Sequence, residues 1–288
     1  DNMIFDAHTD VLFDIINGNH SFDYHLNEME YYHGAVLNYY FKGNESYSSF
    51  LFVLERIKQF YNNNCDTLIK RHFILGIEGL GPLKYLKDIK TLHDAGIRIV
   101  TLTWNDMNKI ATGTYQNKLR GLTTFGKKVL KKLKEYNIVL DLSHLNEKSF
   151  YDVINSYDGA MIVSHSNIKC LKRDERNLSK NQLKQLLKRR ILVGVNSYSN
   201  FAGKTIDDFI NIIVCLKKYI GIDLICLGLD FDYYLANTIK IGAVKGLQTP
   251  KDIPNILKLL KQKGFKEKEI KKIFYENIIN FFKSSLIL

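Results

Sequence analysis

Short runs rich in valine, isoleucine and leucine alternate along this chain with longer segments in which apolar residues recur every three to four positions. Eight of the short runs are candidate strands, and they cover residues 4–8, 35–41, 73–78, 97–103, 138–142, 160–165, 191–196 and 224–230. Several runs are almost continuously apolar, which is typical of strands buried on both faces of a parallel sheet. The alternation predicts parallel strands joined by right-handed helical crossovers.

The segments between these runs carry helix-start signals. Helical patterns follow Thr123, Asn146, Ser179 and Thr205, and each of these residues has the short polar side chain of an N-cap. Two further helices are expected after Thr249 and after Lys266, with Pro250 in the first turn of the former.

Eight strand–helix units are enough to close a sheet into a cylinder. The predicted fold class is therefore α/β, with a (β/α)8 TIM-type barrel. An open doubly wound sheet is the alternative, but it would bind a nucleotide at a glycine-rich first turn, and residues 7–11 contain no glycine. No segment rich in proline, glycine or serine divides the 288 residues, so we expect a single barrel domain over residues 1–288.

The formal net charge of +11 raises the question of a nucleic-acid partner. Most of the lysines lie in helical segments such as 127–134 and 258–272, on the faces opposite leucine and isoleucine. We interpret them as solvated helix faces and expect no nucleic-acid partner. The N-terminus lacks a signal-peptide pattern, no run of about 18 apolar residues occurs, and the four cysteines form no Cys-x-x-Cys pair. We therefore expect a cytoplasmic protein with reduced thiols and no membrane contact.

Histidines and carboxylates gather where the predicted strands end. His8 and Asp10 close the first run, Glu78 closes the third, His144 follows the fifth and His165 ends the sixth. The active residues of such barrels sit at the carboxyl ends of the strands, so we expect these side chains to meet. Imidazole nitrogen and carboxylate oxygen are the ligands that zinc prefers besides thiolate. The pattern predicts a metal site in which a carboxylate such as Glu78 bridges two cations.

These residues lie in motifs that resemble the membrane (renal) dipeptidases, a branch of the metal-dependent amidohydrolases. The motifs are FDAHTD (5–10), GIEG (76–79), LTWN (102–105), RGLTTFGKKVL (120–130), LDLSH (140–144), VSHS (163–166), the pair Arg176-Asn177, VNSY (195–198) and GLDFD (228–232). They occur in the family's order and cover nearly the whole chain. The resemblance implies two zinc ions per chain, one held by His8 and Asp10, the other by His144 and His165, with Glu78 as the bridge.

The resemblance also implies roles for two further residues. Arg176 falls where the family holds an arginine that binds the C-terminal carboxylate of the substrate, a task that suits a bidentate guanidinium. Asp230 falls where the family places the acid that carries a proton to the leaving amine. Asp141, three residues before His144, is a candidate partner of a ligand imidazole, and a polar residue inside the barrel is the equal alternative.

One motif departs from the family pattern. In the animal enzymes the LTxN motif carries a histidine that hydrogen-bonds the substrate carbonyl as it becomes an oxyanion, and here that position is Trp104. Indole offers one N–H donor and no positive charge, so it stabilises the developing charge less well. Trp104 is alternatively a wall of a pocket for an apolar side chain.

The sequence favours a binuclear zinc dipeptidase whose partner is a small dipeptide, and the resemblance implies tolerance of a C-terminal D-residue. A related amidohydrolase acting on another small amide or lactone is the alternative, and a barrel that binds metal or ligand without catalysis is a third. A substrate without a carboxylate has no need of Arg176, so this residue discriminates between the first two. By analogy with the family, a homodimer is a further expectation.

Overall fold

The computed structural model describes residues 3–235 and 242–288. Within these ranges eight strands form one sheet in the order β6-β5-β4-β3-β2-β1-β8-β7, and the paired strands run parallel. The strands are β1 (Ile4–Thr9), β2 (Tyr32–Tyr40), β3 (Phe73–Glu78), β4 (Ile97–Thr101), β5 (Val139–Asp141), β6 (Met161–Ile162), β7 (Val193–Val195) and β8 (Ile225–Leu227). All eight predicted runs therefore contain a strand.

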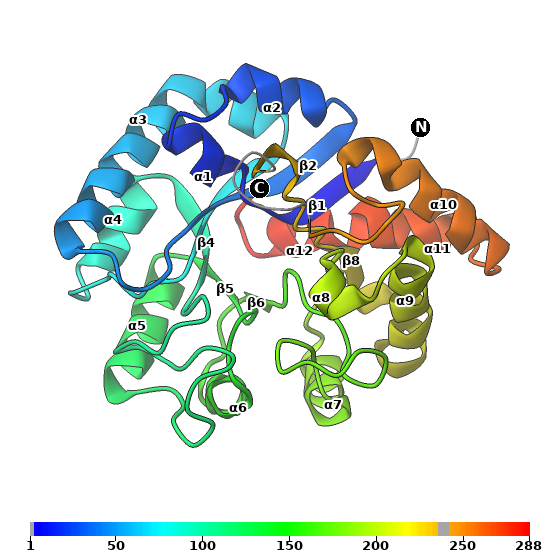
Figure 1. Ribbon diagram of the computed structural model, residues 1–288. Coiled ribbons are helices and arrows are strands. Elements are labelled where there is room, and N and C mark those ends of the chain that lie inside the picture. Colours follow the sequence, from blue (N-terminus) through cyan, green and yellow to red (C-terminus); the bar gives the residue numbers. More distant parts are fainter. Residues whose placement is uncertain (1–2, 236–241) are drawn as a thin grey trace.

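Hydrogen bonds between the segments at β6 and β7 close the sheet into a barrel. Val163 and Val193 form a parallel bridge, the Val163 N–H donates to Leu192 O at 2.9 Å, and the Gly194 N–H donates to Val163 O at 2.7 Å. Helices surround the sheet on its outer side (Figure 1). The fold is a TIM-type (β/α) barrel, and the predicted fold class is confirmed.

The helices begin where the sequence places their N-caps. Helices α5, α6, α7 and α9 follow directly after Thr123, Asn146, Ser179 and Thr205. The first three side chains accept a hydrogen bond from the first turn, and Thr205 forms a capping box. The predicted C-terminal helices are also present, since Pro250 opens a 3-10 turn before α10, and α11 follows Lys266.

The remaining elements complete the outer layer. The α-helices are α1 (Val11–Ile16), α2 (Phe22–Glu28), α3 (Tyr47–Lys70), α4 (Asp88–Asp94), α5 (Thr124–Glu135), α6 (Glu147–Ser156), α7 (Lys180–Arg189), α8 (Ser199–Ala202), α9 (Ile206–Ile220), α10 (Ile253–Gln262), α11 (Glu267–Lys271) and α12 (Asn277–Ser284). Short 3-10 turns are η1 (Ile222–Leu224), η2 (Tyr233–Leu235) and η3 (Pro250–Asp252), and the π-helical turn η4 (Lys272–Glu276) joins α11 to α12. None of the helices in the described ranges has the length and apolar character needed to cross a membrane.

Several strands end earlier than their apolar runs. The run 97–103 leaves the ladder after Thr101, and the runs 160–165 and 191–196 contribute strands of two and three residues. The remaining residues turn into loops whose polar atoms bind neighbouring backbone, as when Thr103 Oγ1 donates to His144 O at 3.2 Å. Hydrophobicity continues through these loops because they remain buried at the barrel mouth.

Two glycines let one backbone segment enter the barrel interior. A Cβ atom at Gly194 on β7, or at Gly228 after β8, would lie far inside van der Waals contact of the Ser164 carbonyl oxygen. Any side chain at either position would push residue 164 outward, so only glycine fits. The neighbouring His165 is thereby held close to the axis of the barrel.

Candidate metal centre

Each predicted ligand comes from the carboxyl end of a strand. His8 lies on β1 and Asp10 directly follows it, while Glu78 is the last residue of β3. His144 and His165 lie in the loops that follow β5 and β6. All five side chains converge at one end of the barrel, as the sequence predicts.

Glu78 lies between two groups of nitrogen donors. Its Oε2 is 3.4 Å from His8 Nε2, while its Oε1 is 2.6 Å from His144 Nε2 and 3.3 Å from His165 Nε2. Asp10 Oδ1 lies 3.6 Å from His8 Nε2, on the same side as Glu78 Oε2. The two oxygens of one carboxylate therefore face two different sets of donors, which is the arrangement of a bridging ligand.

The other nitrogen of each imidazole is anchored. His8 Nδ1 lies 3.1 Å from the Asn38 amide nitrogen, His144 Nδ1 lies 3.0 Å from Asn105 Oδ1, and His165 Nδ1 lies 2.7 Å from Ser164 Oγ. Such contacts fix ring orientation and leave the Nε2 atoms directed at Glu78. Asn38 and Ser164 have no role in the sequence prediction, and a polar residue within the apolar run 35–41 is the signal that could have identified Asn38.

Asp141 acts on a ligand through an intermediate residue. Its carboxylate accepts hydrogen bonds from the backbone N–H groups of Ser143 and Ser164, at 3.0 Å each, and from the Ser164 hydroxyl. Ser164 in turn contacts His165. The sequence hypothesis of a direct Asp141–imidazole contact is replaced by this chain of three residues.

Two positions at the centre have left-handed backbone. His144 has φ 69° and Asp230 has φ 55°, values that non-glycine residues rarely adopt and that cluster at functional sites. The His144 carbonyl accepts three hydrogen bonds, from the Thr114 N–H and from the hydroxyls of Thr103 and Thr114. These bonds hold the His144 backbone in its unfavourable conformation.

Burial and neighbouring charges shift the pKa values of the titratable groups at this centre. Burial, followed by the Arg176 guanidinium, lowers the pKa of His144 to about 4, and burial also holds the pKa of His165 well below its ordinary value. Burial acts to raise the pKa of Glu78, but the neighbouring His8 and His144 hold it well below its usual range. Burial and the carboxylates of Asp10 and Glu78 raise the pKa of Asp230 despite the opposing effect of His8. Burial acts to lower the pKa of His8, but Glu78, Asp10 and Asp230 raise it well above its ordinary value. The two imidazoles beside Glu78 Oε1, those of His144 and His165, are therefore neutral, which is the state that binds a metal ion.

The donor set fits a metal ion. His8 Nε2 and Asp10 Oδ1 are buried and have no hydrogen-bond partner among the described residues. Buried polar atoms are almost always paired, so unpartnered ligand atoms that face one another are suited to binding a cation. Potential ligand atoms of His8, Glu78 and His165, and of His8, Asp10 and Asp230, lie within 4.8 Å of one another.

A cavity of about 1060 Å³ opens above these residues. Asp10, Glu78, His144 and Asp230 lie at its inner end, and Tyr40, Trp104, Tyr115 and Phe201 are among the residues of its walls. This volume accepts a small molecule with two amino-acid residues.

Comparison with known proteins agrees with this geometry. The family model for membrane dipeptidase, peptidase family M19, matches residues 44–285. The chain belongs to this family. The resemblance inferred from its motifs is thereby confirmed.

Individual relatives are distant. An uncharacterized dipeptidase of Schizosaccharomyces pombe is 28% identical over 243 residues, which cover 80% of this chain and 56% of that protein. Dipeptidase tcpJ of Claviceps purpurea is 25% identical over 247 residues, which cover 79% of this chain and 57% of that protein. The chain thus spans little more than half the length of these two relatives.

Solved structures share the fold over nearly the whole chain. A metallo peptidase from Rhodobacter sphaeroides, liganded with a phosphinate mimic of the dipeptide L-Ala-D-Ala, superposes with a TM-score of 0.84 at 18% identity and covers 99% of this chain and 100% of its own. An amidohydrolase from Pseudomonas aeruginosa gives a TM-score of 0.80 at 20% identity and covers 99% of this chain and 96% of its own.

Trp104, which replaces the histidine of the dipeptidase motif, is part of the cavity wall. Its ring centroid lies 6.1 Å from that of Tyr40 and 6.3 Å from that of His144. It therefore stands next to His144, one of the predicted ligands, in the wall of the cavity.

Arg176 is buried behind the cavity wall. Its guanidinium donates to Ser166 Oγ at 2.5 Å and to His165 O at 2.9 Å, and its Nε has no hydrogen-bond partner within the described ranges. Arg173 and Asp174 of the same loop line the cavity, whereas Arg176 does not. The structure thus places Arg176, which is 4% exposed, beside His165 and against Phe201 of the cavity wall.

Another cluster of potential ligands escaped the sequence prediction. His20 and His25, to which the sequence analysis assigns no role, both contact the buried Asp14 Oδ2, at 2.9 and 2.7 Å. His25 packs edge-on against Tyr234, whose hydroxyl accepts the Asp10 N–H at 2.9 Å. His25 Nδ1 has no partner among the described residues, unlike the anchored nitrogens of the three ligand histidines, so we interpret the cluster as structural support for α1 and α2.

Proposed function

We propose that this protein is a dipeptidase that holds two zinc ions per chain. In this proposal His8 and Asp10 bind one ion, His144 and His165 bind the other, and Glu78 bridges them. The observation that carries the proposal is the position of Glu78, whose two oxygens face the two donor groups separately. Imidazole and carboxylate donors suit zinc, although manganese and cobalt accept the same types of ligand.

Two bound cations would supply Lewis acidity toward the peptide carbonyl and toward water at neutral pH. The chain would supply the proton transfer. Asp230 Oδ1 lies 3.7 Å from His8 Nε2, and Asp230 Oδ2 accepts a hydrogen bond from the Asn196 amide at 3.3 Å. Asp230 is thus oriented at the inner end of the cavity, where its free oxygen would accept a proton and release it to the leaving amine.

The substrate would lie in the cavity with its C-terminal end near Arg176. The unpartnered Nε–H of Arg176 supports this orientation, since a buried guanidinium with a spare donor attracts a carboxylate. The opposite part of the cavity, with Tyr40 and Trp104, would hold the N-terminal residue. The relative from Rhodobacter sphaeroides was solved with a mimic of L-Ala-D-Ala, which supports including dipeptides with a C-terminal D-residue.

Metal content and dipeptide hydrolysis, measured on the same preparation, test this function. The purified chain is assayed for zinc, manganese and cobalt, then with L,L- and L,D-dipeptides before chelation, after chelation and after zinc is restored. About two zinc ions per chain and activity that follows the metal would support the proposal. Two metals without dipeptide hydrolysis would favour an amidohydrolase of another small amide or lactone, and failure to take up metal would overturn the site.

A further inference from the structure

Positive charge surrounds one side of the cavity mouth. Besides Lys42, which follows β2 and is also exposed, the lining contains four cations from the loops after β6 and β7 and before η3. They are Lys172, Arg173, Lys204 and Lys245, and all four are exposed. We call these four residues the basic rim. In the part of the chain that the structure describes, none of their side chains forms an ion pair or a hydrogen bond.

Backbone contacts hold the members of the basic rim in two neighbouring pairs. The Lys245 N–H donates to Lys204 O at 3.0 Å, so the loops before α9 and before η3 run side by side. The side-chain amide of Asn177 donates to Lys172 O at 2.9 Å and to Phe201 O at 3.0 Å. Phe201 precedes Lys204 by three residues, so the two pairs are held on the same side of the cavity.

The acids of the cavity do not neutralise this charge. Asp174 accepts hydrogen bonds from the Tyr115 hydroxyl at 2.6 Å and from the Arg176 backbone N–H at 2.8 Å. Asp232 Oδ2 accepts the Gly242 N–H at 2.8 Å, while its Oδ1 is buried, has no hydrogen-bond partner among the described residues and forms no ion pair with a rim residue. The other acids in the lining are Asp10, Glu78 and Asp230 of the metal centre. The basic rim therefore remains available to an anionic group of a ligand.

We infer that the preferred substrates are dipeptides whose C-terminal residue is aspartate or glutamate, and that the basic rim binds the side-chain carboxylate. This inference rests on the proposed dipeptidase function. Arg176 belongs to the same loop as Lys172 and Arg173, and its guanidinium carbon lies 5.7 Å from the ring centroid of Phe201, which lines the cavity. A residue whose terminal carboxylate points toward Arg176 would therefore have its side chain beside the rim.

Charged and neutral substrates of the same shape separate this effect from size. The zinc-loaded chain of 288 residues is assayed with Ala-Glu against Ala-Gln and with Ala-Asp against Ala-Asn. We expect kcat/KM to be at least about 10-fold higher for the acidic member of each pair, because complementary charge accelerates encounter and holds the ligand. The preference should decline with added salt, since the Debye length falls from about 10 Å at 0.1 M to about 3 Å at 1 M.

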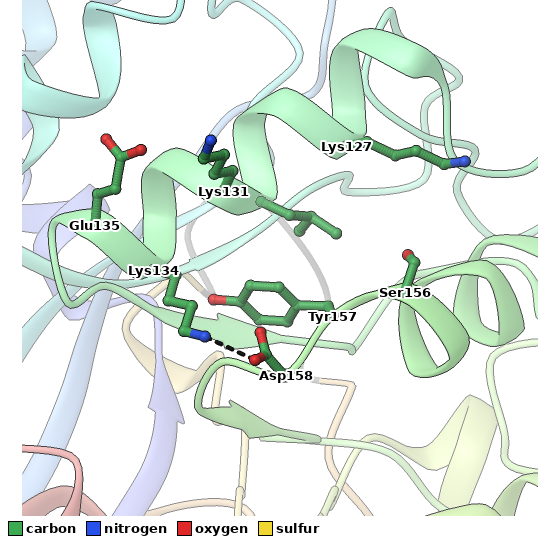
Figure 2. Close-up of a pocket in the computed structure, with 8 residues that line it drawn as sticks. Lys127, Lys131, Lys134, Glu135, Ser156, Tyr157 and Asp158 are labelled. Carbon is green, nitrogen blue, oxygen red and sulfur yellow. Dashed lines mark hydrogen bonds and ion pairs between the residues drawn. The ribbon is translucent and has the colours of Figure 1, made fainter.

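Rim variants are compared with a matched loss of charge elsewhere. The double variant Lys204→Gln/Lys245→Gln should lower the acidic-over-neutral ratio at least about fivefold, as expected when rim charges that steer a ligand are removed. The control is Lys127→Gln/Lys131→Gln, in a pocket of about 600 Å³ between α5 and the end of α6, where Lys134 pairs with Asp158 (Figure 2). None of the residues that line that pocket lines the cavity above the metal centre, so the control should leave the ratio unchanged.

Each outcome decides a different statement. Hydrolysis of acidic and neutral dipeptides with equal kcat/KM would overturn the inference and leave the dipeptidase function standing. The assignment to the basic rim would also be overturned if the acidic-over-neutral kcat/KM ratio did not change with salt concentration. The same would follow if this ratio fell equally in the control variant. Absence of hydrolysis of every dipeptide by zinc-loaded protein would overturn both the inference and the proposed function.

Discussion

Ser164 is the residue that orients the His165 imidazole. Its replacement should weaken metal binding although none of the proposed metal ligands is changed. The Ser164 hydroxyl has one proton, and the Asp141 carboxylate is the stronger acceptor beside it. Ser164 Oγ therefore accepts the Nδ1 proton of His165 at 2.7 Å. This leaves the His165 Nε2 lone pair directed at the region of Glu78 Oε1, 3.3 Å away.

The expected effect of Ser164→Ala follows from the loss of that orientation. Removing a partner that holds a ligand histidine typically weakens metal affinity about 10- to 100-fold, which is about 1.4 to 2.8 kcal/mol. Ser149→Ala is the matched control, because Ser149 is also buried and its Oγ bonds the backbone N–H and carbonyl of Thr112, at 3.1 Å each. Both variants lose a buried hydroxyl and should lose about 1–3 kcal/mol of apo-protein stability.

Competition with a chromophoric chelator measures the two zinc affinities, and denaturant unfolding of the chelated protein measures stability. We expect Ser164→Ala to weaken one of the two sites and Ser149→Ala to weaken neither. Wild-type affinity at both sites in Ser164→Ala would refute the role of Ser164, and so would an equal loss in the control.

Three further predictions concern the cavity and the metal. Trp104→His should raise kcat about 100-fold or more for neutral dipeptides, because an oxyanion donor is worth about that factor; an unchanged kcat would show that Trp104 acts only as a wall. Arg176→Ala should raise KM about 10-fold or more for dipeptides and leave dipeptide amides unaffected, since about 1.4 kcal/mol of carboxylate binding is at stake; equal KM values for both would count against peptide substrates. Chelation should lower the melting temperature by roughly 5–10 °C relative to protein at free zinc 100-fold above Kd, because that excess contributes about 2.7 kcal/mol. A melting temperature that does not depend on zinc would contradict a buried metal centre.

Much of the fold was predictable because local signals and tertiary structure agree. The strands of a (β/α) barrel are buried on both faces, so runs such as 73–78 stand out as uninterrupted hydrophobicity, and β3 has the predicted bounds. Thr123 and Ser179 cap their helices with their own side chains, a signal that depends on neighbouring residues alone. The ligands were predictable for a related reason, since topology brings strand ends together wherever parallel strands close a barrel.

Features that depend on three-dimensional contacts were not predictable in the same way. Asn38 and Ser164 touch their histidines across strands or through a bent loop, and no spacing in the sequence encodes those contacts. The burial of Arg176 behind Ser166 and His165 depends on how the loop after β6 folds back. The four residues of the basic rim come from three loops that are far apart in the sequence. In the sequence alone they cannot be distinguished from other exposed lysines and arginines.

The two glycines that pack against Ser164 are positions in this barrel where no other residue should be tolerated. Gly194 and Gly228 do not line the cavity and supply no proposed ligand atom, yet each leaves the space that the Ser164 carbonyl fills. A methyl group at either position would displace the segment that carries His165, and a misplacement of about 1 Å near a reacting centre can cost about 100-fold in rate. A strict sequence requirement near the metal centre therefore falls on two residues whose contribution is the absence of a side chain.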